Sequence, residues 1–295
     1  MKAAVLTGAA GFSGAVLTET LVKEGYRVYA LVRPGGAHNE RLRSLPEESC
    51  ILTECGLDEY ASLPELLPEL PGAFFFHLAL KGGQTPEEQE KNVLYAEAAL
   101  RAAHALGCSR FIAAGSQAEY GVVDTDVIET EELPPWPVTA YGKAKVEACN
   151  RTKALAGELG IDWVWGRIFS LIGKYEPSGR MLPDLYHSLK RGEDFHLSSC
   201  AQNWDYLDVC DAARAFVALA ERGKDGEIYN IANGDFRPLR EYTEMVREAL
   251  SSGARIIYGD DPDPFISLQP SVKKIKKHTG WVPERSFYDS LRDYD

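Results

Sequence analysis

The stretch TGAAGFSG, from Thr7 to Gly14, follows the apolar run KAAVL and leads into GAVLTETLVKEG, whose apolar residues recur at helical spacing. A glycine-rich turn between a buried strand and a helix directs backbone N–H groups toward an anion such as a diphosphate. Gly8 would permit the tight turn, Gly11 would let the backbone approach the phosphates, and Gly14 would let the helix pack closely on the strand. The stretch therefore predicts a dinucleotide site at the first strand–helix junction; the alternative is a turn with only a structural role.

Strand-like and helix-like segments alternate from this junction to about residue 169. The apolar runs that predict buried strands are residues 2–6, 26–32, 50–54, 73–80, 110–116 and 161–169, and the two long helical patterns are residues 86–107 and 140–160. Consecutive parallel strands need a crossover connection, usually a helix. The alternation therefore predicts an α/β fold with a Rossmann-like, doubly wound parallel sheet.

The pattern changes after about residue 170, where glycine and proline become frequent, as in GKYEPSGRMLP, and the helical patterns shorten. We therefore expect two regions. Residues 1–169, together with a returning segment at about 204–232, would form a dinucleotide-binding domain. Residues from about 170–203 and 233–295 would form a smaller C-terminal region.

The composition of the 295 residues is that of an ordinary globular protein, and the net charge is −12. This net charge argues against a nucleic-acid partner, because phosphate binding needs clustered Lys and Arg. The six cysteines form no CxxC pair and no metal-ligand spacing with His, which predicts free thiols, no metal and a reducing compartment. No apolar run reaches the roughly 18 residues of a membrane-spanning helix, and there is no signal-peptide pattern, so we expect a cytoplasmic protein that does not associate with membranes.

The end of the second predicted strand indicates which dinucleotide is bound. Folds that bind NAD usually carry Asp or Glu there to hold the ribose 2′-hydroxyl, but this strand ends in ALVRPGG, with Arg33 at that place. A guanidinium accepts no hydrogen bond, yet it pairs readily with a 2′-phosphate. We therefore expect NADP, and the alternative is NAD, with Arg33 only a solvated loop residue.

The segment YGKAK has a spacing of four between Tyr141 and Lys145, which places both side chains on one face of a helix. A free phenol has a pKa of about 10, and a neighbouring ammonium favours the phenolate and makes the phenol a better acid–base catalyst. The same spacing occurs at Tyr186 and Lys190, but that pair lacks a setting after a buried strand and is expected to be structural. Ser116 ends the strand RFIAAGS at the edge where open parallel sheets bind ligands, so its hydroxyl is expected to face Tyr141.

With these motifs the chain resembles the extended short-chain dehydrogenase/reductases, and within them the NAD-dependent epimerase/dehydratase family that acts on nucleotide sugars. The matching segments run nearly end to end and are TGAAGFSG (7–14), FHLAL (76–80), GSQAEYG (115–121), YGKAK (141–145), RIFSLIG (167–173), WDYLDVCDAARA (204–215), GEIYNIANG (226–234) and GWVPE (280–284). The combination of TGxxGxxG, Ser and YxxxK is fairly specific for the superfamily, and the later segments indicate the nucleotide-sugar branch.

The resemblance implies roles by position. Ser116 and Tyr141 would contact the reacting sugar oxygen, and Lys145 would bind the nicotinamide ribose beside Tyr141. The region after about residue 170 would bind a nucleotide-sugar substrate, and a homodimer would form through the helices 86–106 and 141–159. The residues that would bind the cofactor are Gly8, Gly11, Phe12, Ser13, Gly14, Arg33, Leu57, Leu78, Ala79, Tyr141, Lys145 and Ile168.

Departures from the family pattern narrow the reaction. The 4,6-dehydratases carry an Asp–Glu pair directly after the Ser position. Gln117 and Ala118 stand there in this chain, and Glu119 comes one residue too late, which disfavours dehydration. Ser170 stands where the family often has an Asn that helps to bind the substrate diphosphate, and Gly56 stands where it usually has an Asp near adenine.

Two reactions fit the remaining residues. The first is reduction of the C4 keto group of a nucleotide-linked 4-keto-6-deoxy sugar by NADPH, with Tyr141 as the proton donor. The alternative is NAD-dependent 4-epimerisation, in which C4 is oxidised and reduced again. Arg33 favours the reductase, because net reductions in the cell usually draw on NADPH. A reductase of a non-sugar carbonyl and a non-catalytic dinucleotide sensor are further alternatives, since one fold hosts many functions.

Overall fold

The structure is a computed structural model that describes residues 2–83, 85–259 and 266–295 of the chain. Its centre is a seven-stranded sheet with the strand order β11-β6-β5-β4-β1-β2-β3, and every pair in it is parallel. The strands are β1 (Ala3–Thr7), β2 (Arg27–Val32), β3 (Cys50–Glu54), β4 (Phe74–His77), β5 (Arg110–Ser116), β6 (Asp162–Ile168) and β11 (Glu227–Ile231). The predicted α/β class with a doubly wound parallel sheet is thereby confirmed.

The central strand β1 shows why these residues form a buried sheet. Its last four residues are buried, and Val5 pairs with Tyr29 of β2 on one side and with Phe75 of β4 on the other. Strands that are covered on both faces are apolar along nearly their whole length, as this one is. The strand order reverses between β1 and β4, and ligands of open α/β sheets bind at the carboxyl ends of the strands beside such a switch point.

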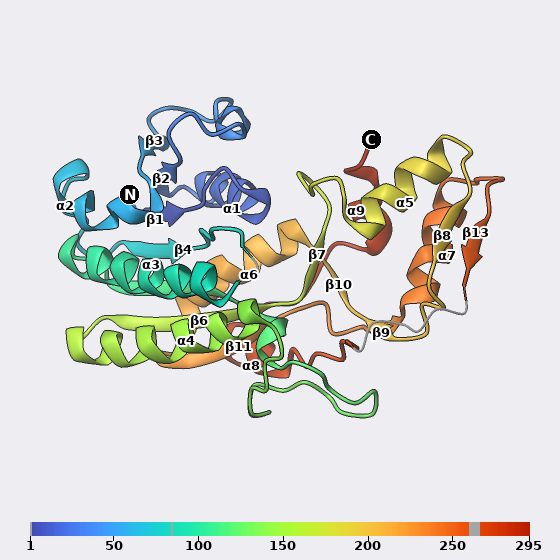
Figure 1. Cartoon of the computed structure of the whole chain (residues 1–295). Coiled ribbons are helices and arrows are strands. Elements are labelled where there is room, and N and C mark those ends of the chain that lie inside the picture. Colours follow the sequence, from blue (N-terminus) through green and yellow to red (C-terminus); the bar gives the residue numbers. More distant parts are fainter. Residues whose placement is uncertain (1, 84, 260–265) are drawn as a thin grey trace.

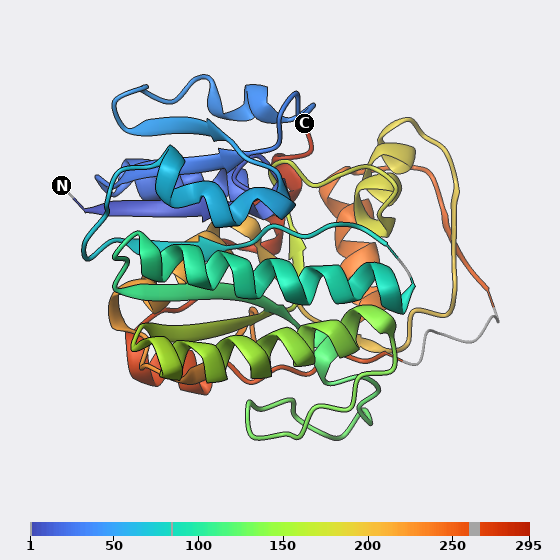
Figure 2. The same cartoon turned by 60° about the vertical axis from the view of Figure 1, so that its left-hand side comes forward.

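Helices cover both faces of the sheet. The long helices α3 and α4 pack side by side on one face together with the short α2 (Figure 1, Figure 2), and α1, α6 and α8 pack on the other. Their bounds are α1 (Phe12–Lys23), α2 (Leu63–Leu66), α3 (Pro86–Ala105), α4 (Ala140–Leu159), α6 (Val209–Arg222) and α8 (Lys273–Thr279). Three short 3-10 turns lie between these elements and are η1 (Asn39–Leu42), η2 (Leu57–Ser62) and η3 (Gln117–Glu119).

The remaining elements form a smaller lobe beside the sheet, drawn on the right in Figure 1. Its helices are α5 (Met181–Lys190), α7 (Leu239–Ala249) and α9 (Phe287–Arg292). Three two-stranded pairs complete it and are β7 (Ser170–Ile172) with β10 (Tyr206–Asp208), β9 (Asn203–Trp204) with β12 (Arg237–Pro238), and β8 (Phe195–Leu197) with β13 (Ile256–Tyr258). Leu185, Tyr242 and Val246 belong to the separate apolar core of this lobe.

Within the described ranges, none of the helices combines the length and the apolar character that crossing a membrane requires.

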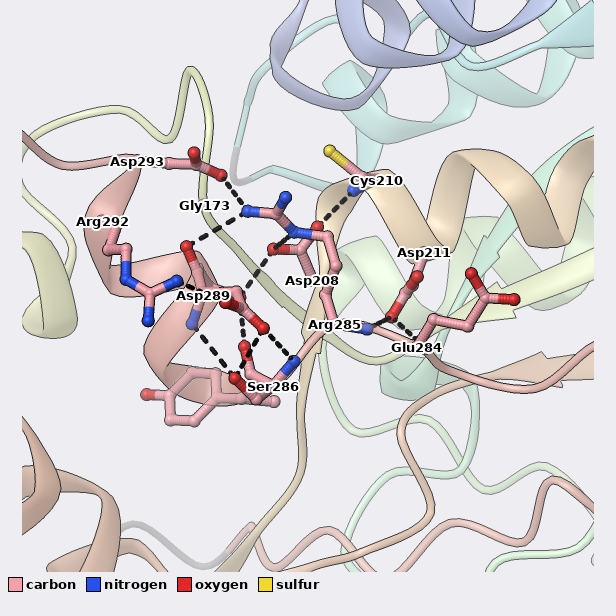
Figure 3. A network of polar contacts seen from close by, with 12 residues as sticks. Gly173, Asp208, Cys210, Asp211, Glu284, Arg285, Ser286, Asp289, Arg292 and Asp293 are labelled. Carbon is pink, nitrogen blue, oxygen red and sulfur yellow. Dashed lines mark hydrogen bonds and ion pairs between the residues drawn. The ribbon is translucent and has the colours of Figure 1, made fainter. Parts of the chain in front are cut away.

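A buried network ties the C-terminal segment of the chain to the start of α6 (Figure 3). The carboxylate of Asp208 caps α6 by accepting from the backbone N–H two residues along at 2.7 Å, and it also accepts from Arg285 Nε at 2.8 Å and Ser290 Oγ at 2.6 Å. Asp211, one turn further, accepts from the backbone N–H groups of Glu284 and Arg285 at 2.9 Å each. The last segment of the chain is thereby fixed to the helix that packs under the sheet.

Replacing Asp208 with Ala removes these three hydrogen bonds and leaves Arg285 without one of its anionic partners. We expect D208A to lower the free energy of unfolding by about 3 kcal/mol, because a lost N-cap costs about 1 kcal/mol and breaking a buried ion pair costs several. Chemical unfolding followed by circular dichroism measures this loss. The control E193A removes an exposed ion pair with Arg191 and should leave the midpoint unchanged; equal effects of the two substitutions would contradict the role of the network.

Candidate active site

The cavity that contains the predicted site residues has a volume of about 1220 Å³. It lies at the carboxyl ends of the sheet strands, since Gly8 follows β1, Arg33 follows β2 and Ser116 ends β5. The smaller lobe supplies its other wall. The structure brings all of the predicted residues to this cavity, and they are Gly8, Gly11, Phe12, Ser13, Gly14, Arg33, Leu57, Leu78, Ala79, Ser116, Tyr141, Lys145 and Ile168.

Two glycines of the first turn are required by the close approach of backbone segments. Gly8 has a φ of +70°, and a Cβ on it would lie 2.9 Å from the Ala79 Cα. A Cβ on Gly14 would lie 2.1 Å from the Gly8 carbonyl oxygen, so only glycine lets α1 begin so near β1. In the described chain no side chain caps α1 at Gly11, and the helix start borders the cavity. Such a turn fits a diphosphate, because helix N-terminal N–H groups attract anions.

The loop after β2 forms the wall next to this turn. Arg33 is exposed, and its carbonyl oxygen accepts from Gly36 N and Asn39 Nδ2, each at 3.0 Å, which holds the loop in place. The cavity-lining residues of this loop carry no carboxylate and are Val32, Arg33, Gly36, Ala37, His38 and Asn39. Asp58, an acidic residue that also lines the cavity, comes from η2 after β3 instead.

The start of α4 brings Tyr141 to the cavity that Ser116 also borders. Thr139 caps the helix by accepting from Gly142 N at 3.0 Å. A Cβ on Gly142 would lie 2.3 Å from the Ala118 carbonyl oxygen, so the first turn of α4 packs directly on η3, the turn that follows β5. Tyr141 and Ser116 consequently border the same cavity although they come from different elements.

Lys145 lies one helical turn beyond Tyr141. Its Nζ donates to the Ala114 carbonyl oxygen at 2.6 Å and lies 5.8 Å from the centroid of the Tyr141 ring. The ammonium is therefore held by the backbone of β5 on one side and lies near the phenol on the other.

His77 packs beneath the same site as an uncharged core residue. Its Nδ1 shares a 2.9 Å hydrogen bond with Thr7 Oγ1, which also accepts from the N–H groups of Leu78 and Ala79 at 3.1 Å each. Because the Thr7 oxygen already accepts two hydrogen bonds, its hydroxyl donates to Nδ1. Burial, and then the charge of Lys145, lower the pKa of His77 to about 3. His77 therefore adds no charge beside Lys145 at neutral pH.

The lobe side of the cavity contains residues that the sequence did not single out: Glu176, Arg180, Met181, Leu182, Trp204 and Tyr206. Glu176 accepts hydrogen bonds from Tyr294 OH and Gly173 N, and burial raises its pKa. Arg180 lies 5.5 Å from the centroid of the Phe12 ring, at the border with the glycine turn. One carboxyl and one guanidinium thus belong to this wall. Both lie in the segment GKYEPSGRM, whose charged residues are the signal in the sequence that could have found them.

The 173–180 loop is fastened across the first helix. Lys174 Nζ and Tyr175 OH both donate to the Glu19 carboxylate of α1, at 2.7 Å and 2.9 Å. Tyr175 has a φ of +68°, and the Arg41 guanidinium lies 4.8 Å from the centroid of its ring. The loop is therefore linked both to the helix that starts at the glycine turn and to the segment after β2.

The residues that follow Ser116 point in different directions. Gln117 lines the cavity, whereas Glu119 is fully buried away from it, with Trp165 and Arg167 as partners. The Glu119 carboxylate therefore does not face a ligand in the cavity. The described residues include no cluster of three or more His, Cys, Asp or Glu side chains that could hold a metal ion.

Comparison with known proteins identifies the class that this fold and cavity define. The profile of the family described as NAD dependent epimerase/dehydratase family matches residues 4–232. The chain belongs to this family of nucleotide-sugar enzymes, the extended short-chain dehydrogenase/reductases, for which an NAD(P) dinucleotide is the typical cofactor.

Its relatives include enzymes with different reactions. The UDP-glucose 4-epimerase of Corynebacterium glutamicum is 25% identical, over 96% of this chain and 91% of its own length. The GDP-6-deoxy-D-mannose reductase of Pseudomonas aeruginosa is 28% identical, over 78% of this chain and 81% of its own length. Family membership therefore does not distinguish an epimerase from a reductase.

The fold is shared with solved structures. The UDP-glucose 4-epimerase of Thermotoga maritima, solved with UDP-glucose, has a TM-score of 0.85 and 22% identity over 98% of this chain and 96% of its own. RMD from Pseudomonas aeruginosa, solved with NADPH, has a TM-score of 0.83 and 24% identity over 100% of this chain and 97% of its own.

Replacing Gly14 with Ala would place a methyl group against the Gly8 carbonyl and push α1 away from β1. We expect G14A to weaken dinucleotide binding about 10-fold or more, because the N–H groups at the helix start move away from the diphosphate. Fluorescence titration with NADPH and NAD measures the affinity. The control is G157A, at an exposed α4 position where a Cβ meets nothing within 4 Å; it should bind normally and gain up to about 1 kcal/mol of stability. Unchanged affinity in G14A would exclude the turn as the diphosphate site.

Proposed function

We propose that the protein is an NADP-dependent oxidoreductase that reduces the C4 keto group of a nucleotide-linked 4-keto-6-deoxy sugar. The observation that carries this proposal is Arg33, which is exposed at the cavity wall on a loop whose lining residues contribute no carboxylate. A guanidinium at the end of the second strand pairs with a ribose 2′-phosphate and accepts nothing from a 2′-hydroxyl. This supports NADP as the cofactor, and net reduction as the reaction.

The proposed proton donor is Tyr141. The bound dinucleotide supplies the hydride that reaches C4 of the sugar. Tyr141 delivers its phenolic proton to the C4 oxygen as negative charge develops there, and Lys145 stabilises the phenolate that remains. Ser116 Oγ already accepts from Ala118 N at 3.2 Å, so its hydrogen is available to donate to the same sugar oxygen.

The surroundings of Ser116 support reduction over dehydration. Elimination of water across a sugar ring needs an acid and a base in addition to the tyrosine. An amide side chain and a methyl group follow Ser116, at Gln117 and Ala118, and the nearby carboxylate of Glu119 is buried in an ion pair with Arg167. These positions supply neither the acid nor the base.

A nucleotide-sugar 4-epimerase is the second candidate, and it would use the same Ser116, Tyr141 and Lys145. The 173–180 loop favours it, because contacts of this loop with Glu19 and Arg41 fix it to the helix that starts at the glycine turn and to the segment after β2. Such a fixed loop suits a cofactor that stays bound through two half-reactions. The epimerase relative also matches nearly the whole chain.

Tracing the hydride tests the proposed reaction. Given deuterated NADPH and a nucleotide-linked 4-keto-6-deoxy sugar, the protein should place one deuterium at C4 of the product, as detected by mass spectrometry and NMR. Y141F should lower kcat by about 100- to 10,000-fold through loss of the proton donor. Y186F is the matched control, because that phenol donates to Asp295 outside the cavity, and its rate should be normal. Interconversion of C4 epimers without net consumption of NADPH would identify the epimerase instead.

Reversing the charge at Arg33 tests the cofactor. R33D should weaken NADPH binding about 10- to 100-fold relative to NADH, because a charge-assisted hydrogen bond to the 2′-phosphate is replaced by repulsion. Fluorescence titration of both dinucleotides measures the ratio. R43D makes the same change of charge at an exposed residue outside the cavity lining and should keep the wild-type ratio. Tighter binding of NAD than of NADP by the wild-type protein would overturn the assignment.

A further inference from the structure

We infer that Glu119 is a positioning residue for the reaction at this site. Its buried carboxylate fixes the backbone of Ser116 and the ring of Trp165, beside which Lys145 lies. The inference rests on the proposed function, since it concerns the groups that surround Tyr141. Glu119 itself does not line the cavity, so it acts only through these neighbours.

The carboxylate of Glu119 joins the end of β5 to β6. Oε1 accepts from Ser116 N and from the indole Nε1 of Trp165, both at 2.9 Å. Oε2 accepts from Arg167 Nε at 2.7 Å, and the side chains of this ion pair are 0% and 4% exposed. Three donors from two strands therefore converge on one buried group, which restricts the positions of all of them.

Two of these contacts lead to the reacting groups. The centroid of the Trp165 ring lies 5.9 Å from Lys145 Nζ, so this ring bounds the space that the ammonium occupies. The N–H that Glu119 holds at Ser116 belongs to the residue whose hydroxyl is proposed to bind the sugar oxygen. Glu119 thus contacts Ser116 directly and reaches Lys145 through one intervening residue, Trp165.

Gly115 provides independent evidence for this arrangement. A Cβ on Gly115 would lie 2.1 Å from Trp165 Nε1 and 2.6 Å from Glu119 Oε1. Gly115 lies in the strand β5 and does not have the left-handed φ that would itself require glycine. The residue is small because the indole and the carboxylate occupy the space beside the backbone.

The arrangement needs a carboxylate and not only an oxygen atom. Burial by itself lowers the pKa of Arg167, but its interactions with the Glu119 carboxylate and with Tyr120 together raise it above the usual value. A glutamine at position 119 would present one acceptor oxygen and one NH₂ donor to three N–H donors. At least one donor would then face another donor, which is unfavourable in a buried site.

Two substitutions test the inference from different directions. E119Q removes the charge, and G115A displaces the same contacts without removing any polar group. We expect each to lower kcat for ketone reduction about 10- to 100-fold, because small displacements of reacting groups have effects of this size. The dissociation constant of NADPH should change much less than kcat, because most of the proposed cofactor contacts, at the glycine turn between β1 and α1, are untouched. A purely structural role would not separate kcat from cofactor affinity in this way in the folded protein.

The control disturbs the same strands away from the site. D162N breaks the ion pair with Arg110 at the other end of β5 and β6. It should keep the wild-type kcat, even with a lower melting temperature. If E119Q and G115A do not fold, the inference is tested with W165F instead. Of the hydrogen-bonding groups in this network, W165F removes only the indole N–H, and it should lower kcat about fivefold.

The outcomes separate this inference from the proposed function. Wild-type kcat in folded E119Q and G115A, or in W165F where those two do not fold, would overturn the positioning role while leaving the proposed reaction standing. A wild-type protein that does not reduce a 4-keto sugar but epimerises C4 would refute the proposed reaction only. The same variants are then compared in the epimerase assay, since that reaction uses the same Ser116, Tyr141 and Lys145.

Discussion

The close approach of α1 to β1 is the constraint on which the rest of the site depends. Backbone atoms of Gly8 occupy the space that a side chain at position 14 would need. The helix α1 can therefore lie this close to β1 only with glycine at position 14. Because the sheet is parallel, the strands next to β1 end at the same edge as this turn. Leu78 after β4 and Ser116 at the end of β5 therefore reach one cavity with it.

A second close contact between backbone segments lies on the other face of the sheet, where α4 begins. Gly142 lets the start of α4 rest on the carbonyl of Ala118, and this contact brings Tyr141 to the cavity that Ser116 borders. The two halves of the candidate site, the glycine turn and the Tyr141–Lys145 pair, are thus both placed by helices that begin against a turn following a strand. Rigid elements of this kind hold reacting groups more accurately than free loops do.

Buried carboxylates serve as internal anchors in this acidic protein. Asp208 and Asp211 fasten the C-terminal segment to α6, and Glu119 joins β5 to β6. Each accepts several hydrogen bonds from backbone N–H groups or cations, which satisfies a charge that would otherwise be costly to bury. Glu176 differs from them because its buried carboxyl borders the cavity itself.

Local patterns in the sequence determined the class of the fold and predicted which residues line the strand side of the cavity. Three patterns can be recognised in the sequence alone, namely TGAAGFSG, YGKAK and the alternation of strands and helices. Each depends on residues that are close along the chain, at spacings set by the geometry of a turn, a helix or a strand. The lobe wall with Glu176 and Trp204, and the partnership of Glu119 with Arg167, were decided only by the tertiary structure. Glu119 and Arg167 are 48 positions apart, and contacts across such distances depend on how whole strands and helices pack, which no local periodicity specifies.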